Sequence, residues 1–516
     1  MSAKRAEKRR SQRAAEREER LRNMPPVKYV KFEDKRKKAS LPNKKSTHQT
    51  PEEEIQERQE IAEKAVKAYH KMLTDILAKM SRISDPRAPE KIKHKMQVLL
   101  VYGILMAMYQ IGSRRKANQV LSKAIFFDNL KTMFPELETM PHADTLARLL
   151  EKIEVEEIQN CMIELLKDFI RRKKFKNFLR KHRYIIAIDG SQKIRRSYEW
   201  SSECLSANVG KEKTPQYYCY VLEAVFVLDS GVVLPVMTEF IENSPQNKIR
   251  VVNQNLSTIK QDCERKGFYR MAAKLKKIFG ASKVTIVADG LYACGPVISI
   301  CKKYNWDYMI TLKEGGLPGI WEESLALMDI NNQNNLGCLW GNRKQKYFWS
   351  NEMEYSYIVG KVTKIVIVNV VICYESWEEV HPRSTKKVEQ KESRYAWLSS
   401  KPLTENNVFY RCTNLARLRW QIEINFLVEK HQGYEFEHCY SYTWNAMKGF
   451  HFLMKIGHFM NVMALNSELL KDKVEEIGIR GFIKLLKLAC EGTTLDKQGL
   501  CAARQEKFIH RLKISA

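Results

Sequence analysis

Two short segments of the sequence place an aspartate between an apolar run and a glycine. They are residues 188–190 (Ile-Asp-Gly) and 288–290 (Ala-Asp-Gly). A carboxylate just past the end of a buried strand is fixed in position and still reachable from solvent, which suits a hard divalent cation such as Mg²⁺. Taken alone, each Asp-Gly pair is more typical of a turn. Asp189 and Asp289 therefore indicate chemistry only if a further acid joins them.

The further acid is Glu423, in the segment ARLRWQIEINFLVEKHQGY, whose apolar spacing predicts a helix. At 100° per residue, Arg419 and Glu423 lie about 40° apart around the axis, and Glu423 and Lys430 about 20° apart. The neighbouring apolar stripe is formed by Leu418, Ile422 and Phe426. An exposed Arg-Glu pair at this spacing is common and worth only a few tenths of a kcal/mol. The spacing is therefore compatible with two interpretations, a solvated ion pair and a functional helix face.

Together, the two aspartates and this helix resemble the DDE transposases of the IS4 family. The helix signature of that family, Y-x2-R-x3-E-x6-K, falls here on Ala416, Arg419, Glu423 and Lys430. Three of the four positions match, and Ala416 stands where the signature has a tyrosine that helps to seat DNA. The resemblance covers roughly residues 183–465.

The resemblance implies a ribonuclease-H-like core in which Asp189, Asp289 and Glu423 hold two Mg²⁺ ions, with Mn²⁺ as a substitute. It also implies contacts with DNA by Arg419, Lys430, Tyr292 and Trp420. Arginine would grip a phosphate with a bidentate fork and lysine would act as a point charge. The expected reactions are cleavage at the ends of an insertion sequence and joining of those ends to target DNA. A homodimer is expected in the DNA complex.

Two other interpretations stay open. One is a ribonuclease-H-fold nuclease that cleaves without strand transfer, and the other is a non-catalytic relative that only binds DNA. Three convergent carboxylates argue against the second, because a binding module has no use for them in a basic groove. The sequence does not separate the nuclease from the transposase.

The charge of the chain independently favours a polyanionic partner. Among 516 residues the formal net charge is +28, while the hydrophobic fraction of 44% is that of a globular protein. Lysine and arginine that neutralise phosphates release condensed counterions, so nucleic acid is the expected partner. A membrane surface and RNA are the competing partners.

Cysteines and apolar runs indicate the compartment. Twelve cysteines without a CxxC pair are typical of a reducing environment. The N-terminus is basic and has no apolar signal segment. The longest apolar stretch, residues 98–111, has about 14 residues and predicts a buried helix rather than a membrane span. We expect a cytoplasmic, nucleoid-associated bacterial protein without a membrane contact.

The elements that must position the acids form an α/β protein in which a ribonuclease-H-like mixed-sheet core with a β-rich insertion follows an all-helical N-terminal domain. The expected segments are a basic disordered arm (1–48), a helical DNA-binding domain (49–180), the first part of the core (181–319), the β-rich insertion (320–407), the second part of the core with the Glu423 helix (408–470) and a basic helical tail (471–516). An ordinary solvated tail and an ordinary helical bundle are the alternatives for the first two.

Local signals fix several of these elements. Thr50-Pro51 followed by acids predicts a helix start. A hairpin is predicted from the alternating runs on either side of residues 229–231, and a basic helix over 257–279. Further strands are predicted at 183–190 and 283–290, each ending at its aspartate, and at 307–313 after a helix.

Two clusters within and after the insertion are weaker candidates for function. The tryptophans in or beside the insertion are Trp321, Trp340, Trp349, Trp377 and Trp397. One of them would stack on a flipped DNA base if the protein forms DNA hairpins, although a core role is more common for each. Near the helix end, His431, His438 and Cys439 lack a second ligand pair at zinc spacing, so a zinc site is not predicted.

Overall fold

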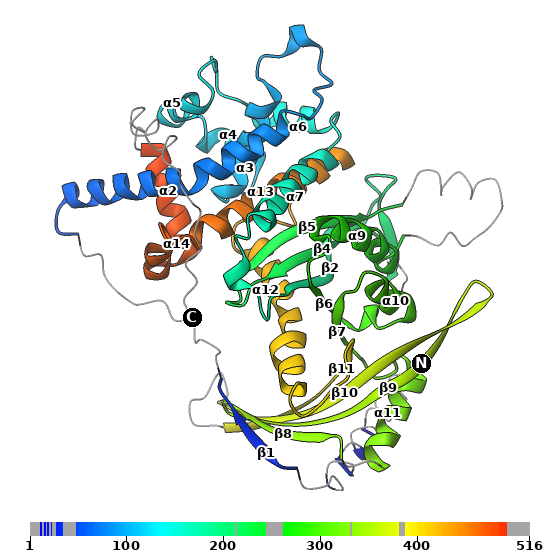
Figure 1. Ribbon diagram of the computed structural model, residues 1–516. Coiled ribbons are helices and arrows are strands. Elements are labelled where there is room, and N and C mark those ends of the chain that lie inside the picture. The colour runs from blue at the N-terminus through cyan, green and yellow to red at the C-terminus, as the bar shows by residue number, and fades with distance from the viewer. Residues whose placement is uncertain are drawn as a thin grey trace. The chain divides into compact units, whose positions relative to one another are not determined.

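The computed structural model describes residues 11–12, 15–16, 18–19, 22, 27–34, 48–210, 212, 214–243, 262–330, 333–380 and 388–492. The chain divides into two compact units (Figure 1). The helix-rich unit comprises residues 38–285 and 418–516, and the strand-rich unit comprises residues 1–37 and 286–417. Both contain helices and strands, which confirms the mixed α/β class.

Helices make up the first half of the helix-rich unit. They are α2 (Pro51–Met80), α3 (Met96–Met108), α4 (Arg114–Val120), α5 (Ala124–Met133), α6 (Ala143–Leu150) and α7 (Glu156–Arg171), with 3₁₀ turns at Pro89–Lys91 and Lys176–Phe178. The predicted start of α2 is confirmed, because the Thr50 hydroxyl accepts a hydrogen bond of 3.3 Å from the Glu53 amide. Residues 49–180 share their unit with strands and with the C-terminal helices, so the contacts do not separate them as a domain.

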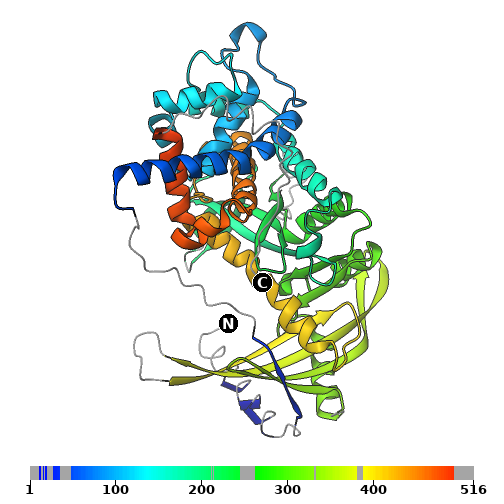
Figure 2. The same cartoon turned by 60° about the vertical axis from the view of Figure 1, so that its left-hand side comes forward.

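The core of this unit lies between α3 and α13 (Trp444–Leu465), which are both buried almost all round. Glycine lets the two helices approach closely. A Cβ on Gly457 would lie 2.7 Å from Cβ of Ala107 and 3.1 Å from the backbone nitrogen of Met108. In Figure 2 α13, drawn in orange, lies among other helices of the unit, and it contacts α2, α3, α6, α7 and α14. The apolar run at 98–111 is therefore a core helix, as predicted.

An antiparallel sheet completes the helix-rich unit. Its strands are β2 (Tyr184–Arg196), β3 (Leu205–Val209), β4 (Thr214–Val227) and β5 (Val233–Ile241). Strand β4 is central, with β2 on one side and β3 and β5 on the other. The pair β4–β5 is the predicted hairpin, and α9 (Glu264–Phe279) is the described part of the predicted basic helix; residues 257–261 of that prediction lie outside the described residues.

One prediction about β2 is wrong in its detail. The strand does not end at Asp189 but continues to Arg196, so Asp189 lies inside it and directly opposite Glu223 of β4. The extension depends on pairing with β4, which a local turn signal cannot reveal. Gly190 makes it possible, since a Cβ there would collide with the ring of Tyr220.

Helices near the C-terminus belong to the helix-rich unit. They are α12 (Trp420–His431), α13 and α14 (Lys471–Gly492), and the chain enters α12 through a 3₁₀ turn at Ala416–Arg419. The helix predicted around Glu423 is therefore present. Helix α14 changes direction at Gly478, where φ is 76°. Residues 493–516 of the predicted basic tail lie outside the described residues.

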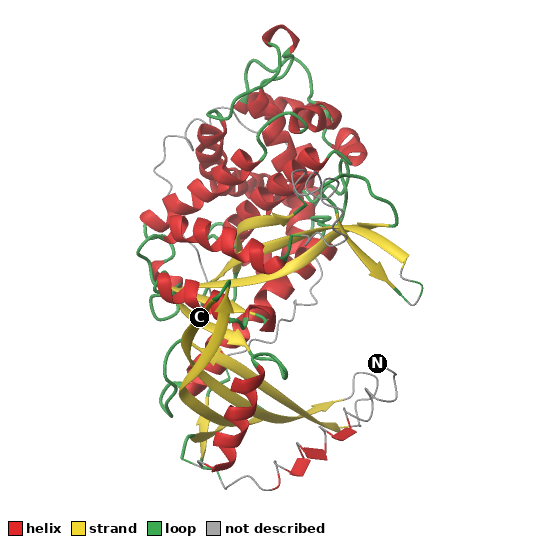
Figure 3. Cartoon of the chain, turned by 90° about the vertical axis from the view of Figure 1, so that its right-hand side faces the viewer, coloured by secondary structure: helices red, strands yellow, loops and turns green. Residues whose placement is uncertain are grey.

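The part of the strand-rich unit that the structure describes is a mixed sheet with the helices α10 and α11, a 3₁₀ turn at Gly290–Tyr292 and a π-helical turn. Its elements are β1 (Tyr29–Phe32), β6 (Val284–Ala288, which begins at the unit boundary), α10 (Gly295–Lys303), β7 (Asp307–Thr311), α11 (Pro318–Ile330), β8 (Asn335–Trp340), β9 (Arg343–Val359), β10 (Val362–Val380), β11 (Val388–Ser399) and the π-helical turn Tyr410–Leu415. The strand order is β1-β8-β9-β10-β11-β7-β6, and β1 runs parallel to β8. Figure 3 shows α11 beside the long strands, in agreement with its contacts to β9.

Two segments of this unit differ from the architecture predicted from the sequence. Residues 29–32, predicted within a disordered arm, form β1, because they pair with β8 rather than fold locally; most of the rest of that arm lies outside the described residues. Helix α11 occupies the start of the predicted β-rich insertion. Within the predicted β-rich insertion, residues 346–350 and 355–360 belong to one long strand, β9, which passes through Glu352 at a φ of 58° opposite an irregularity at 368–370 of β10.

Within the described ranges, no helix is both long enough and apolar enough to cross a membrane.

Candidate functional site

Arg419 brings two of the predicted acids together in the helix-rich unit. Its Nη1 donates a hydrogen bond of 3.3 Å to Oδ2 of Asp189 and one of 2.6 Å to Oε1 of Glu423. The arginine side chain is 12% exposed, that of Asp189 20% and that of Glu423 40%. We call these three residues the acid–arginine cluster. It is largely shielded on the arginine side and reachable from solvent at both carboxylates.

Strand β2 and helix α12 each hold one carboxylate of the cluster. The Gly190 amide donates to Oδ1 of Asp189 at 2.9 Å, so the backbone orients this side chain from one side and Arg419 from the other. Glu423 lies in the first turn of α12, where the partial positive charge of the helix end favours an anion. Both acids are therefore held by fixed elements rather than by loops.

The other predicted residues of α12 point in different directions. Lys430 forms an ion pair of 2.9 Å with Glu437, and its Nζ lies 3.4 Å from the carbonyl oxygen of Gln192 on β2. Trp420 is 51% exposed, and the Arg419 guanidinium lies 4.7 Å from the centroid of its ring. Lys430 thus lies at the junction of α12 and β2 and already has an acidic partner, while the exposed Trp420 ring lies against Arg419.

Sequence reasoning missed an exposed apolar stripe on α12. Ile424 and Leu427 are each about half exposed and follow Trp420 at four and seven positions, which places all three on one helix face. The spacing was visible in the sequence, but the same period also fits the buried stripe of Ile422 and Phe426, so only the structure decides which face is covered.

Asp289 lies in the strand-rich unit, directly after β6, as predicted. Its Oδ1 accepts a hydrogen bond of 2.8 Å from the Leu291 amide, and its Oδ2 forms an ion pair of 2.8 Å with Lys313. Tyr292 is fully buried in the 3₁₀ turn that Asp289 caps. This burial favours a packing role for Tyr292, and its contact with DNA stays a prediction.

The predicted metal ligands are oxygen donors on two units. Within the described residues, no group of three or more His, Cys, Asp or Glu side chains lies close enough to hold a metal ion. Asp189 and Glu423 nevertheless offer two partly exposed carboxylates that share one cation, and carboxylate oxygens are the ligands that Mg²⁺ prefers. The donor type of these two residues therefore fits Mg²⁺.

Burial separates the tryptophans of the insertion. Trp321, Trp340, Trp349 and Trp397 are buried. Trp377 is only half-buried, and the Arg343 guanidinium lies 4.1 Å from its ring centroid. Of the five candidates, Trp377 is thus the one whose exposure is compatible with stacking on a DNA base.

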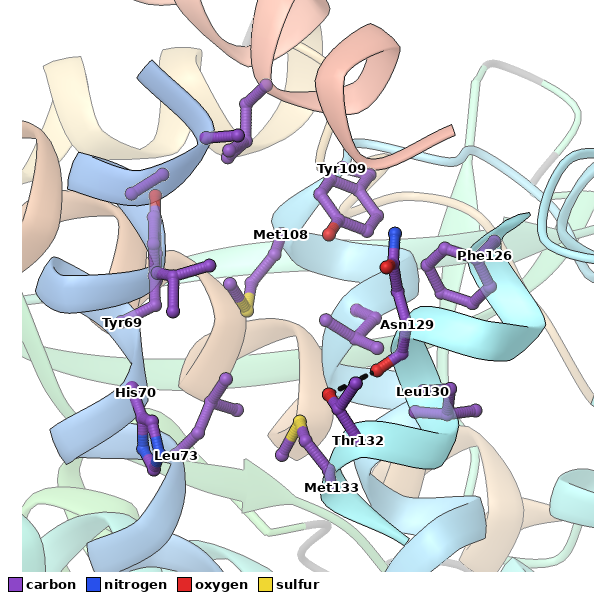
Figure 4. Close-up of a pocket in the computed structure, with 15 residues that line it drawn as sticks. Tyr69, His70, Leu73, Met108, Tyr109, Phe126, Asn129, Leu130, Thr132 and Met133 are labelled. Atoms are coloured by element: carbon purple, nitrogen blue, oxygen red, sulfur yellow. Dashed lines mark hydrogen bonds between the residues drawn. The ribbon is translucent and has the colours of Figure 1, made fainter. Parts of the chain in front are cut away.

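A pocket in the helix-rich unit is unrelated to the predicted site residues. It has a volume of about 120 Å³ and lies among α2, α3, α5 and α14 (Figure 4). Its walls are mostly apolar, including Leu73, Met108 and Leu130, and the Thr132 hydroxyl donates to the Asn129 carbonyl oxygen at 2.6 Å. None of the predicted acids or DNA contacts lines it, so it is a packing gap rather than a candidate for the chemistry above.

Comparison with known families adds information about the helical region. Residues 77–166 match the family model described as DDE_Tnp_1-associated, a region linked to DDE transposase families. The match runs from the end of α2 into α7 and supports a transposase family in general and a transposase-related function. No curated protein matches the chain.

Proposed function

We propose that this protein is a DDE-type DNA transposase of the IS4 kind, which cleaves at the ends of an insertion sequence and joins them to target DNA. The observation that carries the proposal is the acid–arginine cluster, in which Arg419 joins Asp189 to Glu423. These are three residues of the motif on which the resemblance depends. The family match at 77–166 supports the same conclusion from a segment that this motif does not include.

In this proposal Asp189, Asp289 and Glu423 are the ligands of two Mg²⁺ ions. When bound, such ions activate the attacking water or 3′-hydroxyl and stabilise the leaving oxygen. Arg419 compensates the charge of Asp189 and Glu423, and Lys313 compensates that of Asp289. Each acid is thus held next to a cation that can later contact a DNA phosphate.

The net charge of +28 supports DNA as the partner, both as transposon ends and as target. Arg419, Lys430 and Trp420 would contact the strand near the acids, the first two through phosphates and Trp420 through a base face. A homodimer in the DNA complex is part of the proposal.

The decisive experiment incubates the purified full-length protein with Mg²⁺ and duplex DNA that carries the inverted repeats flanking its own locus. Cleaved ends together with joined products support a transposase. Cleavage without joined products supports the nuclease without strand transfer. Binding without cleavage supports the non-catalytic DNA-binding relative.

Single substitutions then test the ligands. Asp189→Ala, Asp289→Ala and Glu423→Ala should each abolish Mg²⁺-dependent cleavage and leave DNA binding intact. Asp128→Ala and Glu468→Ala, which remove exposed acids of the helix-rich unit, are the matched controls and should cleave normally. Wild-type cleavage by any of the three ligand variants would reject that residue as a ligand.

A further inference from the structure

A group of charged side chains is buried in the helix-rich unit, on β4, α12 and α13. Nζ of Lys455 lies 2.7 Å from Oε2 of Glu429 and 3.0 Å from Oε1 of Glu223. Nδ1 of His458 lies 2.7 Å from Oε1 of Glu429. We call these four residues the buried charge cluster. It joins three elements, since Glu223 lies on β4, Glu429 on α12, and Lys455 and His458 on α13.

The cluster is almost completely removed from solvent. The side chains of Lys455 and Glu223 are 2% and 1% exposed, and those of His458 and Glu429 are 4% and 0% exposed. Taking charges out of water costs several kcal/mol for each ion, and well-packed apolar side chains often stabilise a fold as well or better. Stability alone therefore gives little reason for this cluster, whereas ion pairs of fixed geometry can specify how elements meet.

The buried charge cluster joins α12, which carries Glu423, to β4, the strand that pairs with β2 and its Asp189. Glu223 is the direct cross-strand partner of Asp189, so the two side chains project from the same face of the sheet. Glu429 is on the same helix as Glu423 and about 120° around the axis from it, since six residues turn the helix by about 600°. The buried side of α12 thus binds Lys455, while a different side presents Glu423 to Arg419.

Further side chains contact Glu223 at one end of the buried charge cluster and His458 at the other. The Thr238 hydroxyl donates to Oε2 of Glu223 at 2.9 Å, and Nε2 of His451 lies 3.2 Å from Oε1 of the same carboxylate. At the other end, the Tyr434 ring lies 4.4 Å from that of His458. Lys455 is the residue that contacts both carboxylates, and it is therefore the link between strand and helix.

We propose that Lys455 is a positioning residue, which fixes the rotation and the axial position of α12 against β4 and so holds Glu423 beside Arg419 and Asp189. Its effect on catalysis rests on the proposed function, but its effect on α12 does not. A residue that merely adds stability would protect all elements of the unit alike, whereas a positioning residue acts on α12 first.

The test compares variants of the full chain by amide hydrogen exchange. Lys455→Met removes the charge and keeps a side chain of similar length. Because it leaves two buried carboxylates without a cation, a second variant, Lys455→Met with Glu223→Gln and Glu429→Gln, removes all three charges. Lys448→Met is the matched control: it removes another buried lysine of α13, whose partners are Glu156 and Glu242.

In the charge-free triple variant, amide exchange in α12 should rise at least tenfold more than exchange in α7, although the protein stays folded. Lys448→Met removes a partner of Glu156 on α7, so it should not raise exchange in α12 above exchange in α7. Equal increases in α12 and α7, or wild-type protection of α12 in the triple variant, would overturn the proposal.

Cleavage supplies a second measurement that separates this inference from the proposed function. If the wild-type protein cleaves DNA, the triple variant should lose at least tenfold in kcat with an unchanged KM for DNA, because the acids shift while the DNA-binding surface stays. An unchanged kcat would overturn the catalytic part of the proposal. If the wild-type protein does not cleave, the proposed function fails, and the exchange experiment still decides the role of Lys455.

Discussion

Nη1 of Arg419 lies 3.3 Å from Oδ2 of Asp189, although 230 residues separate the two in the chain. The same nitrogen lies 2.6 Å from Glu423, so one guanidinium compensates two carboxylates. The charge of Arg419 thus offsets part of the negative charge of both acids. In this state Arg419 keeps the two acids together against their mutual repulsion.

Replacing Arg419 should therefore affect DNA binding and cleavage to different degrees. If the guanidinium contacts one phosphate, Arg419→Ala should reduce the slope of log affinity against log salt concentration by about 0.9. Cleavage should fall more than affinity, because the two acids are no longer held together. Arg419→Lys should recover the salt dependence better than the cleavage, since lysine keeps the positive charge but lacks the planar guanidinium whose Nη1 reaches both acids.

DNA binding titrated at several salt concentrations checks this prediction. Lys64→Ala, which removes an exposed cation of α2, serves as the control for a general loss of positive charge. A salt dependence that is unchanged in Arg419→Ala would show that the arginine does not contact the backbone of DNA.

A change of ligand chemistry at Asp289 tests direct contact with a metal ion. Asp289→Cys replaces a hard oxygen ligand by a softer sulfur, which Mg²⁺ binds poorly and Mn²⁺ tolerates better. Cleavage by this variant should be lost in Mg²⁺ and partly restored in Mn²⁺, and chelation of all divalent ions should abolish it in every variant. Asp128→Cys, on an exposed acid, should cleave equally well in both metals. Full activity of Asp289→Cys in Mg²⁺ would remove this residue from the ligand set.

The pKa values of two glutamates in the buried charge cluster are shifted in opposite directions. Burial raises the pKa of Glu223 to about 7, and the nearby charge of Glu429 acts in the same sense. Burial also tends to raise the pKa of Glu429, but the charge of Lys455 and the hydrogen bond with His458 outweigh it and lower that pKa below its usual value of 4.5.

The raised pKa of Glu223 makes stability depend on pH. The fold favours the protonated form, so this contribution is fully present below pH 4.5 and is lost as pH rises through about 7. Glu223→Gln stays neutral throughout, and its stability relative to the wild type should rise across this window by on the order of 3 kcal/mol. Urea unfolding at pH 5 and pH 8 measures the difference. A stability difference that is the same at both pH values would contradict the raised pKa.

Local sequence signals were sufficient to predict the features that depend on neighbouring residues in the chain. The helix start at Thr50, the β4–β5 hairpin and the place of Asp289 after β6 all follow from capping, alternation and strand-end patterns. The helix around Glu423 follows from its period. These features gave the mixed α/β class and two of the three acids in their correct local setting.

The features that could not be predicted from the sequence depend on contacts between residues far apart in the chain. Asp189 was placed at a strand end because Asp-Gly normally begins a turn, whereas β4 holds residues 190–196 in the strand. The role of Lys455 was invisible for a similar reason, because a lysine in a helical segment is usually solvated. The apolar composition of the segment that forms α13 was the one sign in the sequence that Lys455 is buried. The two glutamates that pair with it lie on other elements, so the sequence did not reveal them.

The pocket among α2, α3, α5 and α14 gives a test of packing that is independent of function. Ala65 and Ala68 are both buried on α2, but only Ala65 lines the pocket of about 120 Å³. Ala65→Leu should place its added carbons in existing space and stabilise the protein by about 0.5–2 kcal/mol. Ala68→Leu should instead force atoms into a filled region and cost about 1–3 kcal/mol. Both variants replace alanine by leucine on the same helix, so the effect of helix propensity cancels. The difference between their melting temperatures therefore reports whether the added carbons meet empty or filled space. Equal melting temperatures for the two variants would show that the pocket closes in solution.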